Sequence, residues 1–252
     1  MDHWSELENV VTDDGDVMTL RESGGEFEMR FNGWELMSSR SSLSEETLAR
    51  VACEHLAQNA PRILIGGLGM GYTLRAALDS LGPDARIVVS ELFPEVVDWN
   101  RGTLASLTSR PLDDDRVSVC IGSVVDVLAT HRLSFDAILL DVDNGPEALL
   151  YEPNRVLYSV AGMELIRSAL VPDGILGVWS ADHSPGFEAV LDADGMTWRR
   201  VDVTCGTPTR VPGRGGGRGE AAGQVTVCQD SKNPEHTIYL ARTVPHPPCA
   251  RP

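Results

Sequence analysis

The segment from residue 62 to residue 74 constrains the fold more than any other part of the chain. A short apolar run at 62–65 leads directly into a cluster of glycines, and a helical stretch follows the cluster. The glycines of this cluster are Gly66, Gly67, Gly69 and Gly71. Glycine lets a turn approach a ligand closely and leaves the amide groups at a helix N-terminus free to face that ligand. The segment therefore predicts a strand, a ligand-binding turn and a helix, the first unit of an α/β sheet.

Short apolar runs alternate with helical stretches along the following part of the chain. Further strand candidates lie at 86–90, 117–121, 136–141 and 175–179. They show little polar alternation, which indicates strands covered on both faces, as in a parallel sheet. Two later runs, at 198–203 and 236–241, predict the antiparallel ending that is typical of class I methyltransferases. The predicted fold class is therefore α/β, with a Rossmann-like, mostly parallel sheet of seven strands and helices on both faces.

Residues 1–40 predict a small N-terminal β-meander. Gly24-Gly25 and Asn32-Gly33 stand between alternating runs, and such pairs favour hairpin turns because they accept positive φ at little cost. So small a sheet cannot bury its apolar face alone, so we expect that face to cover part of the ligand cleft or the twofold interface of a homodimer. The side chains expected there are Phe27, Met29, Phe31 and Trp34.

Residues 41–243 are predicted to form the Rossmann-like catalytic domain, which opens with a helix. Ser42 and Glu45 have the spacing of a capping box at the start of that helix. A stretch at about 205–223 is so rich in Gly and Pro that it predicts a flexible loop. Arginines in this stretch leave an RNA-binding loop as an alternative to a solvated one. Residues 244–252 are predicted to be a disordered tail.

The charge of the chain limits its partners. A formal net charge of −16 disfavours nucleic acid and suits a small cationic substrate such as an amine, although acidity that only keeps the protein soluble is the other interpretation. The first residues are acidic where a secretory signal would be basic, and no apolar run approaches the roughly 18 residues of a membrane span. We therefore expect a cytoplasmic protein with no membrane partner. Its five scattered cysteines are expected to be free thiols.

The glycine cluster and Glu91 together predict a nucleoside ligand. The spacing of the glycines differs from the dinucleotide pattern, because Tyr72 stands where that pattern has its third glycine. Glu91 ends the second strand, where a carboxylate accepts hydrogen bonds from ribose hydroxyls. An ordinary carboxylate at a strand end is the alternative.

Polar residues that follow later strands are candidates for catalysis. Asp141 and Asp143 come directly after the fourth strand, where they should face the cleft, although Asp141 could instead cap a loop. Three neighbouring oxygen ligands on one loop rarely suffice for a metal, so we predict none. His183 follows the fifth strand and is a candidate base near neutral pH, with a surface position as the alternative.

The order of these motifs resembles the spermidine synthase family over about residues 26–180. The resemblance lies in the glycine cluster followed by Thr73, in Glu91, in Gly122 and in the run that ends at Asp141. It implies an N-terminal β-domain before a class I methyltransferase-type domain, and a cofactor that is S-adenosylmethionine or its decarboxylated form. It also implies that Gly122 and Ser123 contact the adenine.

Four features of the family pattern differ in this sequence. Met70 and Asn144 stand where the family has two functional aspartates, Ser123 stands where it has a third, and the first helix lacks its Tyr-His-Glu cluster. These replacements make methyl transfer from S-adenosylmethionine to a small-molecule acceptor the first expectation, with Asp143 as the first choice of base and Asp141 as the second. Aminopropyl transfer to an amine is the alternative. A noncatalytic nucleoside-binding or assembly module is a third possibility.

Overall fold

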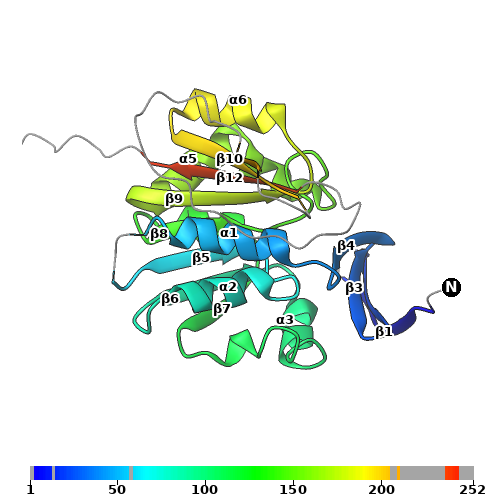
Figure 1. Ribbon diagram of the computed structural model, residues 1–252. Helices are drawn as coiled ribbons and strands as arrows, with labels where there is room; N and C mark the ends of the chain where they lie inside the picture. Colours follow the sequence, from blue (N-terminus) through cyan, green and yellow to red (C-terminus); the bar gives the residue numbers. More distant parts are fainter. Residues whose placement is uncertain (1–2, 13–14, 57–58, 205–208, 211–235, 244–252) are drawn as a thin grey trace, which may run out of the picture.

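The computed structural model describes residues 3–12, 15–56, 59–204, 209–210 and 236–243. They form two sheets, and the smaller one lies at one end of the larger (Figure 1). The small sheet is antiparallel and has its strands in chain order. These strands are β1 (Ser5–Val11), β2 (Val17–Ser23), β3 (Glu26–Phe31) and β4 (Trp34–Ser38).

The predicted meander is confirmed, and its turns form for the predicted reason. Gly24 and Gly25 have φ of 61° and 91°, and Asn32 and Gly33 have φ of 50° and 81°, so both hairpins use two residues of positive φ. The first strand, β1, was missed in the sequence because it lacks the apolar alternation of a half-buried strand. Its residues are mostly exposed, and it forms one edge of the sheet.

The large sheet confirms all seven predicted strands and adds a short eighth one. Its order is β11-β10-β12-β9-β8-β5-β6-β7, and only β12 runs antiparallel to both of its neighbours among the seven long strands. The extra strand β11 pairs antiparallel with β10. The strands are β5 (Arg62–Gly66), β6 (Arg86–Glu91), β7 (Val117–Ile121), β8 (Phe135–Leu140), β9 (Leu170–Ser180), β10 (Thr197–Val203), β11 (Thr209–Arg210) and β12 (His236–Arg242).

Helices cover both faces of this sheet, as predicted. One buried cluster joins Ile63 and Ile65 of β5 to the helices α1, α2 and α3 and to the small sheet. A second cluster joins Leu64, on the other face of β5, to α4, α5 and α6. The helices are α1 (Leu43–Cys53), α2 (Tyr72–Ser80), α3 (Pro94–Arg101), α4 (Val124–Thr130), α5 (Val160–Ala169) and α6 (Pro185–Asp194), with short 3-10 turns η1 (Pro111–Asp113) and η2 (Glu152–Tyr158).

The predicted capping box at the start of α1 is wrong, although the helix itself is confirmed. Ser42 is the N-cap residue but accepts no backbone hydrogen bond with its side chain. Its Oγ instead donates to Glu46 Oε1 at 2.7 Å. Glu45, the expected partner in the box, turns away to line a cavity.

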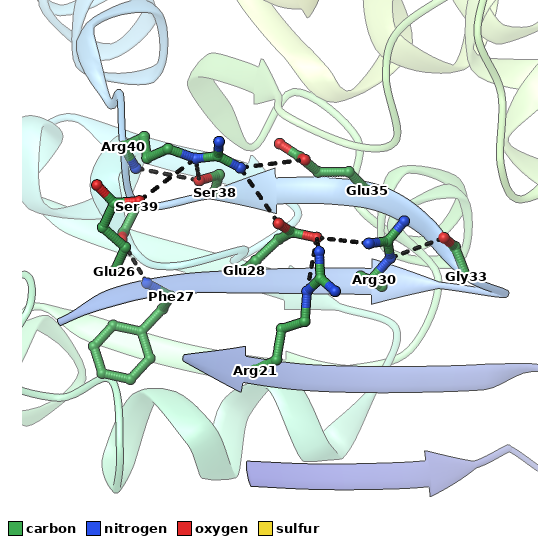
Figure 2. Close-up of polar contacts among 10 residues, drawn as sticks. All are labelled: Arg21, Glu26, Phe27, Glu28, Arg30, Gly33, Glu35, Ser38, Ser39 and Arg40. Carbon is green, nitrogen blue, oxygen red and sulfur yellow. Dashed lines mark hydrogen bonds and ion pairs between the residues drawn. The ribbon is translucent and has the colours of Figure 1, made fainter. Parts of the chain in front are cut away.

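The outer face of the small sheet carries a cluster of charged side chains around Glu28 (Figure 2). Glu28 is only 1% exposed, and its two carboxylate oxygens contact three guanidinium groups. Arg21 lies 2.6 Å away, Arg30 3.1 Å and Arg40 3.3 Å. Because these residues come from β2, β3 and the segment that follows β4, the cluster holds the strands and that segment in place relative to one another.

Two of the predictions fall largely outside the described residues. Of the predicted flexible loop at about 205–223, only β11 is described, and the predicted tail at 244–252 lies outside the description altogether. The domain boundary at residue 40 stays a prediction. Within the described part of the chain, no helix has the length and apolar character needed to cross a membrane.

Candidate functional site

A cavity lies where the carboxyl ends of the parallel strands meet the inner face of the small sheet. Loops after β5, β6, β7 and β8 form its floor, and Met29 and Phe31 of β3 contribute to its wall. Trp34, expected in the same role, points away and is 70% exposed. The full lining is Met18, Met29, Phe31, Leu36, Met37, Glu45, Gly67, Gly69, Ser90, Glu91, Leu92, Phe93, Val96, Gly122, Ser123, Val124, Asp141, Val142, Asp143, Tyr151, Asn154 and Trp179.

Gly67 and Gly69 line this cavity, as the glycine cluster predicted. Gly67 has φ of 86°, and a Cβ on it would collide with the carbonyl oxygen of Asp141. Gly66 and Gly71 are not lining residues and have supporting positions. Gly66 is the last residue of β5, and Gly71 is the left-handed N-cap of α2. The loop therefore presents backbone to the cavity and packs tightly on the side away from it.

The glycine loop also contacts the small sheet directly. The Met70 backbone N–H donates to Met37 Sδ at 3.2 Å, and a Cβ on Gly69 would lie 2.7 Å from the same sulfur. On the other side, Asn100 Nδ2 donates to the Gly69 carbonyl at 2.7 Å. The loop is thus held between β4 and α3, and a larger residue at Gly69 would disturb the protein as well as any ligand.

Glu91 lies at the cavity, at the end of β6, as predicted. Its Oε2 accepts from the Leu68 N–H at 2.8 Å and its Oε1 from the Phe93 N–H at 2.9 Å. Burial raises the pKa of Glu91, and these backbone donors oppose that shift. Each carboxylate oxygen keeps a further lone pair for a ligand hydroxyl. Glu91 is therefore both a possible ribose acceptor and a fixed part of the loop.

Gly122 and Ser123 lie on the loop after β7 and also line the cavity. Ser123 is the N-cap of α4, and its Oγ accepts a hydrogen bond from the Val125 N–H at 3.2 Å. Its hydroxyl proton is free to point elsewhere. Beside these residues the lining is apolar, with Leu92, Phe93 and Val124. Small backbone loops, an apolar wall and a carboxylate at Glu91 together suit a flat ring attached to a ribose.

Asp141 faces a second carboxylate, Glu45, that the sequence analysis did not identify. Thr73 Oγ1 donates to Asp141 Oδ2 at 2.6 Å. Burial raises the pKa of Glu45 to about 7, with the charge of Asp141 adding to the shift. Burial likewise raises the pKa of Asp141 to about 6. The spacing from Ser42 indicates only a capping role for Glu45, and no local pattern shows that β8 would bring Asp141 to it.

Asp143, the first choice of base, is committed to its own loop. Its Oδ1 accepts from the backbone N–H groups of Leu150 and Tyr151 at 3.1 and 3.0 Å, and its Oδ2 accepts from Asn154 Nδ2 at 2.6 Å. Burial raises the pKa of Asp143, and the three donors oppose the shift. The carboxylate lines the cavity but already organises the segment from 150 to 154.

His183 does not belong to this cavity, contrary to the expectation that it would face the cleft. Its Nε2 lies 2.9 Å from Glu188 Oε1, and its side chain is 45% exposed. The segment after β9 leads outward to α6 and carries His183 to the surface. The structure therefore favours the alternative for His183, a position on the surface.

The charges that line the cavity are all of one sign. Glu45, Glu91, Asp141 and Asp143 contribute carboxyl groups, whereas none of the lining residues within the described part of the chain is Lys, Arg or His. Carboxylates with low-dielectric walls attract cations and disfavour anions. The cavity is therefore suited to a positively charged ligand.

Comparison with known proteins finds sequence similarity to polyamine aminopropyltransferases. No protein-family model matches the chain. It is 31% identical over 126 residues to the polyamine aminopropyltransferase of Mycobacterium tuberculosis, a match covering 49% of this chain and 23% of that protein. It is 33% identical over 137 residues to polyamine aminopropyltransferase 1 of Streptomyces coelicolor, covering 53% of this chain and 24% of that protein. The match thus spans about a quarter of the length of these relatives.

Solved structures show the same fold over nearly the whole chain. Spermidine synthase from Thermotoga maritima has a TM-score of 0.68 at 18% identity, covering 96% of this chain and 74% of that one. A spermidine synthase in complex with the transition-state analogue AdoDATO has a TM-score of 0.67 at 18% identity, with the same coverage. The chain is therefore spermidine synthase-like in fold, with a class I methyltransferase-type sheet behind an N-terminal β-sheet, and it is related in sequence to the polyamine aminopropyltransferases.

Proposed function

We propose that the protein is an aminopropyltransferase that uses decarboxylated S-adenosylmethionine and an amine. The observation that carries this proposal is the one-signed cavity, with four carboxyl side chains and no cationic one among its described lining residues. Intact S-adenosylmethionine has a carboxylate that would find no cationic partner there, whereas the decarboxylated form and an amine acceptor are both cations. Methyl transfer, the first expectation from the sequence, is not supported by the relatives, which are aminopropyltransferases and spermidine synthases.

The residues around the adenosine side of the cavity fit the nucleoside part of this donor. Glu91 would accept from the ribose hydroxyls, Gly67 and Gly69 would allow close approach of the backbone, and Gly122 and Ser123 would border the adenine. When bound, the donor supplies an alkyl carbon activated by a sulfonium leaving group. The protein then has to align the amine with this carbon and remove a proton from the amine.

Glu45 and Asp141 are the carboxylates best placed for the amine. Met70 stands where the family has an aspartate, and its thioether carries no charge. Its side chain is also fully buried and does not line the cavity. We assign Asp141 to holding an ammonium group, because Thr73 fixes its carboxylate. We assign Glu45 to accepting the proton, because it lines the cavity beside Asp141 and because burial and the charge of Asp141 raise its pKa toward neutral pH, where a base is effective. This replaces Asp143, whose oxygens already accept three hydrogen bonds.

The test compares both donors by calorimetry and by turnover. We expect the decarboxylated donor to bind at least about tenfold more tightly than S-adenosylmethionine, which corresponds to about 1.4 kcal/mol. We also expect methylthioadenosine to form only when an amine is present. Glu45→Gln should lower kcat, whereas the control Glu46→Gln, one residue along α1 and partly exposed, should not.

Two other results would contradict the proposal. Tighter binding of S-adenosylmethionine, with S-adenosylhomocysteine as the product, would establish methyl transfer instead. Tight binding of either compound without turnover on a broad panel of amines would support a noncatalytic nucleoside-binding module.

A further inference from the structure

We propose that Ser44 and His236 form a proton path that connects Glu45 to the side of the protein where β12 begins. The proposal rests on the function proposed above, because that reaction releases a proton inside the cavity. It adds two positioning residues, Ser44 and His236, neither of which lines the cavity.

The path consists of two short hydrogen bonds between three side chains. Ser44 Oγ donates to Glu45 Oε2 at 2.6 Å and lies 2.7 Å from His236 Nδ1. Ser44 is 2% exposed, so its hydroxyl has little access to water. Trp179, which lines the cavity, packs edge-on against the His236 ring at a centroid distance of 5.0 Å and holds the imidazole in place. The contact joins residues 192 positions apart in the sequence.

The chemistry of amine alkylation explains why such a path is needed. An ammonium nitrogen first gives a proton to the Glu45 carboxylate, and its freed electron pair forms the new C–N bond while the C–S pair returns to sulfur. Glu45 must then lose that proton before the next turnover. Its nearest charged neighbours, Asp141 and Glu46, are carboxyl groups, and Thr73 and Ser44 are hydroxyls. Of these two hydroxyls, Ser44 is the one that leads away from the cavity.

A proton can pass along this chain because Ser44 and His236 each take up one proton and release another. The Glu45 carboxyl gives its proton to Ser44 Oγ as the Ser44 hydroxyl proton passes to His236 Nδ1. The imidazolium then releases the proton from Nε2 to water, which leaves the ring protonated on Nδ1. Before the next turnover the ring returns to its Nε2–H tautomer by proton exchange with water, and the Ser44 hydroxyl returns by rotation. Burial lowers the pKa of His236 and the charge of Asp182 raises it, so the ring favours the neutral form that can accept the next proton.

The first test needs no substrate. Nitrogen NMR of the His236 ring in the ligand-free protein should show a titration step that reflects Glu45, and Glu45→Gln should remove this step. Ser44→Ala should also remove it, whereas Ser44→Thr, which keeps the hydroxyl, should retain it. Identical His236 titrations in the wild type and in Glu45→Gln would overturn the proton path.

The second test uses the rate of transfer. His236→Gln can still hydrogen-bond to Ser44 but cannot relay a proton, so we expect kcat to fall about 10- to 100-fold with KM little changed, and added imidazole to restore part of the rate. His131→Gln is the control, because His131 bonds to the Val127 carbonyl far from the cavity.

Wild-type kcat and pH profile in His236→Gln would overturn the path and leave the proposed function standing. A coupled titration in a protein that transfers no aminopropyl group would overturn the proposed function and leave the path standing.

Discussion

Glu45 has one role according to its position in the sequence and another according to its position in the structure. At three residues after Ser42 it has the position of a capping-box acid, yet its carboxylate lies in the cavity with a raised pKa. Placing two carboxyl groups in a buried site costs free energy, because each loses its hydration and repels the other. A bound cation would offset this cost by pairing with the two carboxylates. Carboxyl groups with raised pKa values are therefore expected at a binding site for cations.

The first prediction concerns how this pair affects stability with pH. The folded pKa values, about 7 for Glu45 and about 6 for Asp141, lie above the ordinary values of 4.5 and 3.8 for these side chains. Between about pH 4 and pH 7 the native state therefore binds more protons than the unfolded chain, so this pair lowers the free energy of unfolding as the pH rises. Glu45→Gln should raise that free energy at pH 8 by about 1 to 3 kcal/mol relative to wild type and by much less at pH 5.

Urea unfolding at both pH values measures this difference, and Glu46→Gln is the matched control on the same helix. Because other groups also titrate, the quantity to compare is the difference between variant and wild type at each pH. A difference that stays constant between pH 5 and pH 8 would show that Glu45 titrates normally.

The second prediction concerns Glu91, which has a structural role as well as a binding one. Glu91→Ala removes a charged acceptor from the ribose, so affinity for methylthioadenosine should fall by about one to two powers of ten. It also leaves the N–H groups of Leu68 and Phe93 without their acceptor, so the melting temperature should fall too. Calorimetry and thermal unfolding measure the two effects, with Glu95→Ala on α3 as the control. An unchanged affinity in folded Glu91→Ala protein would remove Glu91 from the binding site.

Single residues could be predicted only where a local pattern identified them. Gly67, Glu91 and Asp141 each end or follow a strand of a parallel sheet, and that position alone places them at the cavity. Glu45 and His236 have no such local signal. They approach the site because β12 inserts between β9 and β10 and α1 packs against these strands, which is a property of the topology.

At the scale of elements, the small sheet depends on a charge cluster that its sequence does not reveal. Its turns could be predicted, because glycine and asparagine at the hairpins have a direct conformational cause. Its outer face could not. Glu28 is flanked by the apolar residues Phe27 and Met29, and only the register of β2, β3 and β4 brings Arg21 and Arg40 to it (Figure 2).

The third prediction follows from this cluster. Glu28→Gln leaves three arginines close together without the charge that holds them, so we expect a loss of about 2 kcal/mol in the free energy of unfolding, below the value for a fully buried pair because the arginines are partly exposed. Since the inner face of the same sheet lines the cavity, nucleoside affinity should also fall. Glu35→Gln, whose carboxylate is half exposed, is the control. Wild-type stability in Glu28→Gln would show that the cluster contributes nothing measurable.

At the scale of the whole molecule, the order of the strands explains how the carboxyl groups of the proposed cation site come together. The carboxyl ends of the parallel strands β5, β6, β7 and β8 lie at one edge of the large sheet, and the small sheet lies beside that edge (Figure 1). Residues from both sheets line the cavity. The fold class could be predicted because its apolar strands and glycine turn are local signals. That the small sheet would cover something followed from its size, because so small a sheet cannot bury its apolar face alone. The choice between the cleft and a twofold interface could not be predicted, since no pattern in residues 1–40 indicates what that face covers.

The fourth prediction concerns the binding of an amine by this assembled site. Affinity for a small diamine should fall about tenfold or more between pH 8 and pH 5, because Glu45 and Asp141 become protonated over that range and lose their charge. Calorimetry at the two pH values measures the change, and adenosine, which is neutral, serves as the control ligand. Equal diamine affinity at both pH values would exclude these carboxylates from amine binding.

The uniform charge of the cavity also bears on how the proposed enzyme would finish a cycle. Transfer of the aminopropyl group turns the sulfonium into a neutral thioether and removes the ammonium that this group carries, so the nucleoside product has lost both positive charges of the donor. The carboxyl groups that favour entry of the donor then have less hold on what remains, and a fresh donor competes well against the spent one. Weak inhibition by the thioether product is therefore built into a site of this charge, and it would keep the enzyme working when that product accumulates.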